Sequence, residues 1–265
     1  MPLCFHPFIF APLALMRTIG VQGYDPAVIM FFFVSMYTVI LPLIFGLLGY
    51  RKLDKGLRYF FFMLVLVLVT ETSAFARGSE GNDNLDIYNA FTALEYFFLM
   101  LMFSTWYEKG KLQSFMLYSI PVFLVVWITA KYILKVSDQF DSILLSIESV
   151  VFVILSVLTL MKEMRDSRVL LVDNPVFWIS SGVLVYFAGN LFVFALIDQL
   201  LKDTVSRLHS AWLIHATLNV SKNILYSLGF ISTGGPKETL RPMFGKLWRF
   251  FRELLFGRRT PKAQD

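Results

Sequence analysis

Seven long apolar stretches separated by short polar breaks make up most of this chain. Each stretch is about twenty residues long, which at about 1.5 Å per residue lets an α-helix cross a hydrocarbon core of about 30 Å. The pattern therefore predicts an all-α fold, a polytopic membrane bundle of seven transmembrane helices. The predicted spans cover residues 27–48, 57–76, 85–106, 113–133, 140–161, 175–200 and 208–231.

Two of these spans begin with a polar capping residue followed by proline. Asp25-Pro26 opens the first predicted span, and Asp173-Asn174-Pro175 opens the sixth. Proline suits the first helical turn because the N–H that it lacks would have no partner there. A further proline, Pro121, lies inside the fourth span and predicts a kink.

The segments outside the bundle differ from it and from each other. Residues 1–24 are apolar but are interrupted by Pro7 and Pro12, so we expect this segment not to span the membrane. It is an interfacial segment, a stretch upstream of another start at Met16, or an ordered cap over the helices. Residues 25–233 form the transmembrane domain.

The remaining residues, 234–265, form a basic amphipathic tail. Apolar residues recur there at helical spacing beside lysine and arginine, which predicts a C-terminal helix lying on the membrane surface. Such a helix either anchors the chain to anionic lipid or docks a cytoplasmic partner.

Composition agrees with the membrane prediction. The chain is 57% hydrophobic and 17% aromatic, with a mean hydropathy of +0.64, which excludes an ordinary water-soluble domain. The net charge of +5 would suggest nucleic acid in a soluble protein, but here the basic residues lie in short loops and the tail. We therefore expect membrane lipid as a partner and no nucleic acid. The single cysteine, Cys4, excludes an intrachain disulfide and a thiolate metal cluster.

The distribution of lysine and arginine predicts the orientation. Apart from Lys222, seventeen of these residues fall on one face of the predicted bundle and six on the other. Because short cytoplasmic loops carry the excess of positive charge, the N-terminus is expected outside and the C-terminus in the cytoplasm. The predicted location is the plasma (inner) membrane.

The last span carries the most unusual residue, Lys222, near the middle of an apolar helix. A lysine at this depth is costly unless it is paired, so it marks a functional site by default. His215, Asn219 and Lys222 are spaced i, i+4, i+7, which places them along one side of the helix.

Other polar residues fall at similar depth when the spans are followed in alternating directions. These are carboxylates in the second, third and fifth spans and an asparagine in the sixth. The candidate ligand-binding or charge-pair residues are Glu71, Glu95, Glu148, Asn190, His215, Asn219 and Lys222. The sixth span also contains two glycines, Gly182 and Gly189. Their lack of a side chain would let this helix approach a neighbour closely.

Two interpretations of these residues remain open. In the first, Lys222 pairs with Glu95 or Glu71 around a polar pocket that opens outward and binds a small-molecule ligand. In the second, the pair only fixes the packing of the helices.

Known catalytic chemistries are not supported by the sequence. The chain has only three histidines, His6, His209 and His215, and the last two are six residues apart, off the i, i+4 spacing of a helical metal site. No nucleophile elbow or phosphate-binding loop is present. We therefore expect no catalytic residues and no bound metal.

Lys222 in the seventh helix resembles the lysine that carries retinal as a Schiff base in microbial rhodopsins. The likeness covers the helix count, the topology and this lysine only. The carboxylate that a rhodopsin would place one turn earlier is Leu218 here, so retinal on Lys222 is disfavoured and no cofactor is expected.

A second resemblance covers most of residues 27–231. It is carried by Asn174-Pro175-Val176-Phe177-Trp178, Tyr186 with Gly189-Asn190, Tyr88-Asn89 with Glu95, and Asn219 with Asn223. These motifs resemble those of uncharacterised bacterial seven-helix inner-membrane proteins. The resemblance implies the fold and no particular activity.

These observations predict a receptor-like or sensor-like membrane protein with a polar pocket in its outer half. The sequence carries no recognisable signalling domain, so its output would pass through a separate cytoplasmic signalling protein. The alternative is a secondary transporter or proton-coupled carrier that uses Lys222 and the intramembrane carboxylates. A lipid-modifying membrane enzyme is the third possibility.

Overall fold

The computed structural model describes residues 26–80, 82, 84–133, 138–166, 171–201 and 205–233. Every regular element within these residues is a helix, and none of them forms a strand. The predictions for residues 1–24 and for the tail from residue 234 lie outside the described residues.

The helices follow the predicted order. The α-helices are α3 (Pro26–Tyr37), α4 (Ile40–Leu48), α5 (Lys55–Ser79), α6 (Leu85–Thr105), α7 (Lys111–Ile128), α8 (Asp138–Asp166), α9 (Pro175–Leu201) and α10 (Val205–Ser232). Three short helical turns accompany them, η1 (Tyr50–Lys52), η2 (Thr129–Ile133) and η3 (Leu171–Asp173). Since α3 and α4 are two halves of one broken helix, the described residues form the seven predicted helices.

Five of these helices are long and apolar enough to cross a membrane. They lie in Lys55–Ser79, Asp86–Thr105, Lys111–Lys131, Leu144–Arg165 and Pro175–Phe192, within the part of the chain that was described. The apolar segment Phe33–Leu48 is shorter, and α10 is not among the five. The chain therefore has the helices of a membrane protein.

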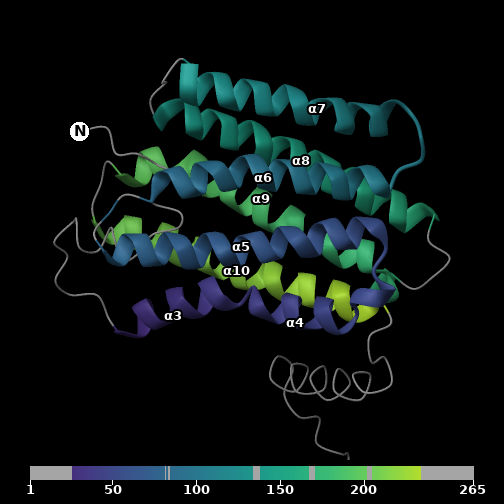
Figure 1. The fold of residues 1–265 in the computed structure, drawn as a ribbon. Coiled ribbons are helices and arrows are strands. Elements are labelled where there is room, and N and C mark those ends of the chain that lie inside the picture. The colour runs from purple at the N-terminus through teal and green to yellow at the C-terminus, as the bar shows by residue number, and fades with distance from the viewer. Residues whose placement is uncertain are drawn as a thin grey trace, which may run out of the picture.

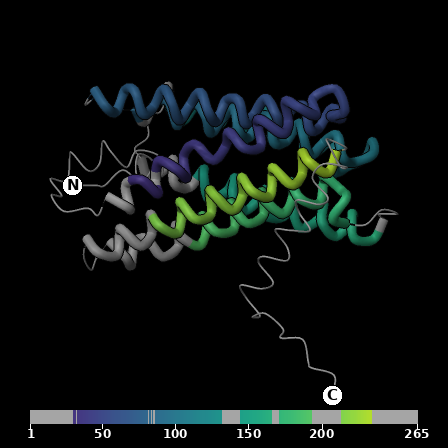
Figure 2. The backbone as a smooth tube through the Cα atoms, turned by 90° about the horizontal axis from the view of Figure 1, so that it is seen from below, coloured from purple at the N-terminus to yellow at the C-terminus, as the bar shows by residue number. Residues whose placement is uncertain are grey.

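The helices lie side by side with their long axes along one direction (Figure 1). Contacts join α5 to α6, α8 to α9, and α10 to both α9 and α4. Seen from below, α3 and α4 lie over α5 and α10 (Figure 2). Phe152 of α8 is fully buried where three helices meet, against Tyr96 of α6 and Phe187 of α9.

The prediction of one continuous helix over residues 27–48 is wrong. The helix breaks at Thr38 and Val39, between α3 and α4. The cause is Pro42, which has no N–H for the Thr38 carbonyl and whose ring would clash with that carbonyl in a regular helix. The freed Thr38 carbonyl accepts a tighter bond from the Leu41 N–H instead, at 3.0 Å.

The structure describes the capping residue at only one of the two predicted helix starts with proline. Helix α9 begins at Pro175, and the Asn174 Oδ1 atom accepts a hydrogen bond from the Val176 N–H at 2.9 Å. Asn174 is therefore the capping residue of this start. Helix α3 begins at Pro26, while Asp25 lies outside the described residues. Pro121 lies inside α7, which continues to Ile128 and then into η2.

Helices α9 and α10 approach each other closely because glycines line their contact. A Cβ atom at Gly182 would lie 2.5 Å from Tyr226 Cε1, and one at Gly189 would lie 2.5 Å from Leu218 Cδ1. On the other side of the contact, a Cβ atom at Gly229 would lie 2.6 Å from Ile179 Cδ1. Small residues thus set the distance between these two helices.

We expect Gly182→Ala to lower the free energy of unfolding by about 1–3 kcal/mol, because the added methyl group overpacks a contact in which Tyr226 is already buried. Thermal and denaturant unfolding of the purified protein in detergent measures this change. Gly110→Ala is the control, since a Cβ atom there would lie 3.8 Å from its nearest neighbour, the Glu108 carbonyl oxygen. Equal stability of the two variants would contradict the role of the close contact.

Candidate functional site

Lys222 lies inside the bundle and is only 7% exposed. Its Nζ atom sits 3.5 Å from the centroid of the Tyr186 ring, which belongs to the neighbouring helix α9. An ammonium group over an aromatic face is attracted by the ring quadrupole, and the attraction grows when water is excluded. Among the described residues, no carboxylate oxygen comes within 4.0 Å of Lys222 Nζ.

Two of the predicted carboxylates lie within electrostatic reach of Lys222 without touching it. Glu71 of α5 and Glu95 of α6 are both buried, and the charges of both act on the Lys222 ammonium group. The structure therefore brings α5, α6 and α10 together around opposite charges. The direct contact of Lys222 is with an aromatic ring instead of a carboxylate.

Glu148 of α8 is the most deeply buried acidic residue in the described part of the chain. It is 0% exposed, and neither of its carboxylate oxygens has a hydrogen-bond partner. It interacts electrostatically with Glu95. The ring of Phe152, one turn further along α8, contacts that of Tyr96, the residue after Glu95, which places the two carboxylates at a similar level.

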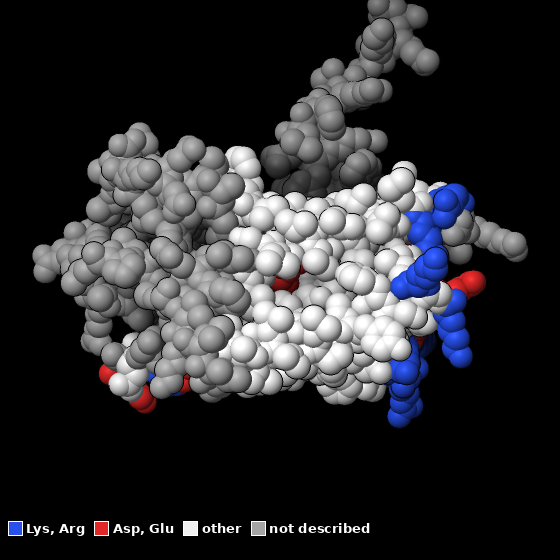
Figure 3. All heavy atoms as spheres, turned by 90° about the horizontal axis from the view of Figure 1, so that it is seen from above, with Lys and Arg blue, Asp and Glu red and all other residues white. Residues whose placement is uncertain are grey.

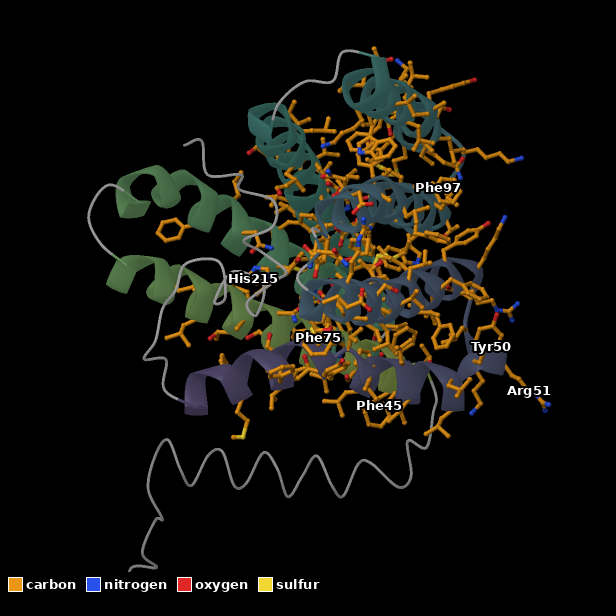
Figure 4. The ribbon with its side chains drawn as sticks, turned by 60° about the vertical axis from the view of Figure 1, so that its left-hand side comes forward. Phe45, Tyr50, Arg51, Phe75, Phe97 and His215 are labelled. Carbon is orange, nitrogen blue, oxygen red and sulfur yellow. The ribbon has the colours of Figure 1, made fainter. Side chains whose placement is uncertain are left out.

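Asn190 and His215 form a second polar contact across α9 and α10. The His215 Nδ1 atom and the Asn190 Oδ1 atom are 2.9 Å apart. Figure 4 shows the His215 side chain directed from α10 toward α9. The rings of Tyr186 and His215 lie 6.0 Å apart, so this pair adjoins the contact between Lys222 and Tyr186.

Asn219 lies apart from the other candidates, because it faces α3. Its Nδ2 atom donates to the Ser35 carbonyl at 2.8 Å, and the Ser35 hydroxyl donates to the Ala216 carbonyl at 3.0 Å. Asn223, one turn further along α10, donates to the Thr38 hydroxyl at 2.8 Å. These bonds tie α10 to the break between α3 and α4.

The sequence interpretation missed four residues of this region as site components. In the sequence, Tyr186 and Asn223 stand out only in the motifs that carry the resemblance to seven-helix inner-membrane proteins. Ser35 and Thr38 were overlooked, although their i, i+3 spacing in an otherwise apolar run was a visible sign of a polar helix face.

The site has a mixed chemical character. Three buried carboxyl groups, Glu71, Glu95 and Glu148, accompany one buried ammonium group, Lys222, and the aromatic ring of Tyr186. No group of three His, Cys, Asp or Glu residues in the described part of the chain is arranged to hold a metal ion. The arrangement brings both signs of charge and an aromatic face together inside the bundle.

Most of the described basic residues lie at one end of the molecule (Figure 3). They come from the α4–α5 connection, the α6–α7 connection and the end of α8.

Lys162, at the end of α8, contacts the residues that follow α6. Its ammonium group donates a hydrogen bond to the Trp106 carbonyl and lies 5.0 Å from the centre of the Tyr107 ring. The Tyr107 hydroxyl is 3.0 Å from Thr159 Oγ1, and burial raises the pKa of this hydroxyl. Lys162 thus ties the end of α8 to the end of α6.

Comparison of the chain with protein families, curated proteins and solved structures gives no match. The chemistry of the site is therefore inferred from its own geometry.

We expect Asn219→Leu to lower the free energy of unfolding by about 0.6 kcal/mol, and by no more than about 1.7 kcal/mol, because the interhelical contact of its amide with the Ser35 carbonyl and hydroxyl is lost. Thermal unfolding in detergent measures the change. Thr217→Val is the control, since the exposed Thr217 hydroxyl bonds only to the Leu213 carbonyl of its own helix. An effect of Thr217→Val as large as that of Asn219→Leu would contradict the interhelical bond.

Proposed function

We propose that the chain crosses the inner membrane seven times, with its N-terminus outside and its C-terminus in the cytoplasm. The gathering of lysine and arginine at one end supports this orientation (Figure 3). The shorter α3–α4 segment and the polar α10 count as spans because their polar groups bond to one another inside the bundle, as at Ser35, Asn219 and Asn223.

Within this bundle, the protein acts as a receptor or sensor that binds a small polar molecule between α5, α6, α9 and α10. The observation that carries this proposal is the position of Lys222. A lysine kept only to fix helix packing would be expected in ion-pair contact with a carboxylate, because an uncompensated buried charge is strongly destabilising. Lys222 instead rests on Tyr186, with two carboxylates within reach but none in contact.

Such a receptor would transmit its signal through contacts made by its basic end. Exposed lysines and arginines there, with the basic tail of the sequence, suit an acidic surface on a cytoplasmic signalling protein or the anionic lipid of the inner leaflet.

A secondary carrier is the second candidate, and the break in α3–α4 favours it. Many carriers use discontinuous helices near the substrate site, where freed backbone groups become available. Here the break at Thr38 and Val39 is contacted by Asn223, the neighbour of Lys222. Uptake of labelled solute or protons into proteoliposomes would favour the carrier, whereas ligand-dependent stabilisation without flux would favour the receptor.

The binding proposal is tested with a panel of small amines, amino acids and carboxylates, each added to the purified protein. A compound at about 100 times its Kd should stabilise the wild type by about 2.7 kcal/mol. We expect Lys222→Met to fold and to lose this stabilisation, because the compound no longer meets the ammonium group. Lys111→Met, at the exposed start of α7, should keep it.

Three results would contradict the proposal. Equal stabilisation of Lys222→Met and Lys111→Met would place the binding site elsewhere. Failure of Lys222→Met alone to fold would make the lysine structural, and a panel without any stabilising compound would rule out these ligand classes.

The orientation is tested by cysteine labelling in a Cys4→Ser background. With Glu80→Cys, in the connection between α5 and α6, we expect labelling of intact cells by a membrane-impermeant maleimide. With Lys109→Cys, between α6 and α7, labelling should require permeabilised cells. The reverse pattern would invert the topology, and equal labelling of both sites in intact cells would contradict a spanning α6.

A further inference from the structure

Glu148 is a buried carboxylate without the hydrogen bonds that a carboxylate with a structural role would have. Buried polar groups are almost always hydrogen-bonded, and a carboxylate can accept several bonds. Both oxygens of Glu148 are buried without a partner, although Tyr96 and Glu95 lie on the helix opposite. A charged carboxylate in this position would have lost its hydration and gained nothing in return.

The titratable groups that the structure shows acting on Glu148 come from α6. Among the described residues, Glu95 and Tyr96 are the groups that interact electrostatically with it. Helix α9 contributes the apolar ring of Phe187, which contacts Phe152 of α8. The Tyr96 ring stacks on Phe123 of α7, with their centroids 3.9 Å apart, so α7 also adds an apolar surface here. Lys222 interacts electrostatically with Glu95, which in turn interacts with Glu148.

We propose that Glu148 and Glu95 form a proton-binding site in the middle of the bundle. A proton from a hydronium ion in the solvent forms an O–H bond with one Glu148 oxygen and leaves a water molecule behind. The neutral acid then has no charge to bury, and its O–H group is a donor for which the Glu95 carboxylate is the nearby acceptor. In this arrangement Glu95 is the ionised partner, because it is the carboxylate of the two on which Lys222 acts.

A proton suits this site better than a metal cation. A bound metal ion would keep its charge in the same cluster as the Lys222 ammonium group, and it would need several oxygen ligands. A proton requires one oxygen atom and no cavity. In Figure 3, part of an acidic residue is visible at the bottom of a small opening in the apolar middle of the molecule.

This proton site goes beyond the proposed function, because it requires no ligand and holds for a receptor and a carrier alike. A change in helix packing that gave Glu148 a hydrogen-bond donor or water would favour release of the proton. Movement of α8 against α6 would therefore be coupled to proton binding.

Infrared spectroscopy of the purified full chain in liposomes tests the proposal. At a pH where exposed carboxyl groups are ionised, the wild type should show the carbonyl stretching band of a protonated carboxylic acid. We expect Glu148→Gln to lose this band. Glu163→Gln is the matched control on the same helix, at the end where Glu163 accepts a hydrogen bond from Asn174, and should keep it.

Absence of the band in the wild type, or its survival in Glu148→Gln, would overturn the proposal. If Glu148→Gln does not fold, Glu148→Asp and Glu95→Gln take its place, and each should shift the frequency of the band. An unshifted band in both would also overturn it. Because this experiment uses no ligand, it can contradict the proton site without contradicting the Lys222 binding site. The ligand panel can likewise contradict the Lys222 site without contradicting the proton site.

Discussion

The close contact between α9 and α10 is the constraint on which the rest of the site depends. Glycines on both helices remove the side chains that would hold them apart, at Gly182, Gly189 and Gly229. This distance allows Lys222 to lie against the Tyr186 ring and His215 to reach Asn190. With Lys222 held against α9, it acts on the carboxylates of α5 and α6 at a distance instead of collapsing onto one of them.

Polar groups inside the bundle fall into two classes, those with hydrogen-bond partners and those without. Where Pro42 breaks the first helix, Asn219 and Asn223 of α10 supply donors, as expected when broken helices are buried among their neighbours. Glu148 has no such donors. Because low-dielectric surroundings make an unpartnered polar group expensive, the contrast separates the polar contacts that hold the fold from those available for function.

The helices were predictable because each depends on local sequence. Apolar runs about twenty residues long, polar breaks and the Asn174-Pro175 start are read directly from the chain, and α5 to α10 match the predicted spans to within a few residues. The exception, at Thr38, is also local, because Pro42 lies four residues further on and has no N–H to donate to the Thr38 carbonyl. Glu71, Glu95, Glu148 and Lys222, which the sequence places at similar depth, are all buried inside the bundle.

The sequence by itself determined the helical fold, the membrane character of the chain and the residues that carry charge inside it, because hydrophobicity and helix period act over short distances. Only the tertiary structure decided which of these residues meet. It placed Lys222 on Tyr186, turned Asn219 toward Ser35 and left Glu148 without a hydrogen bond. These outcomes depend on helix rotation and on interhelical distance. Both arise from packing between segments far apart in the chain, which a one-dimensional pattern does not encode.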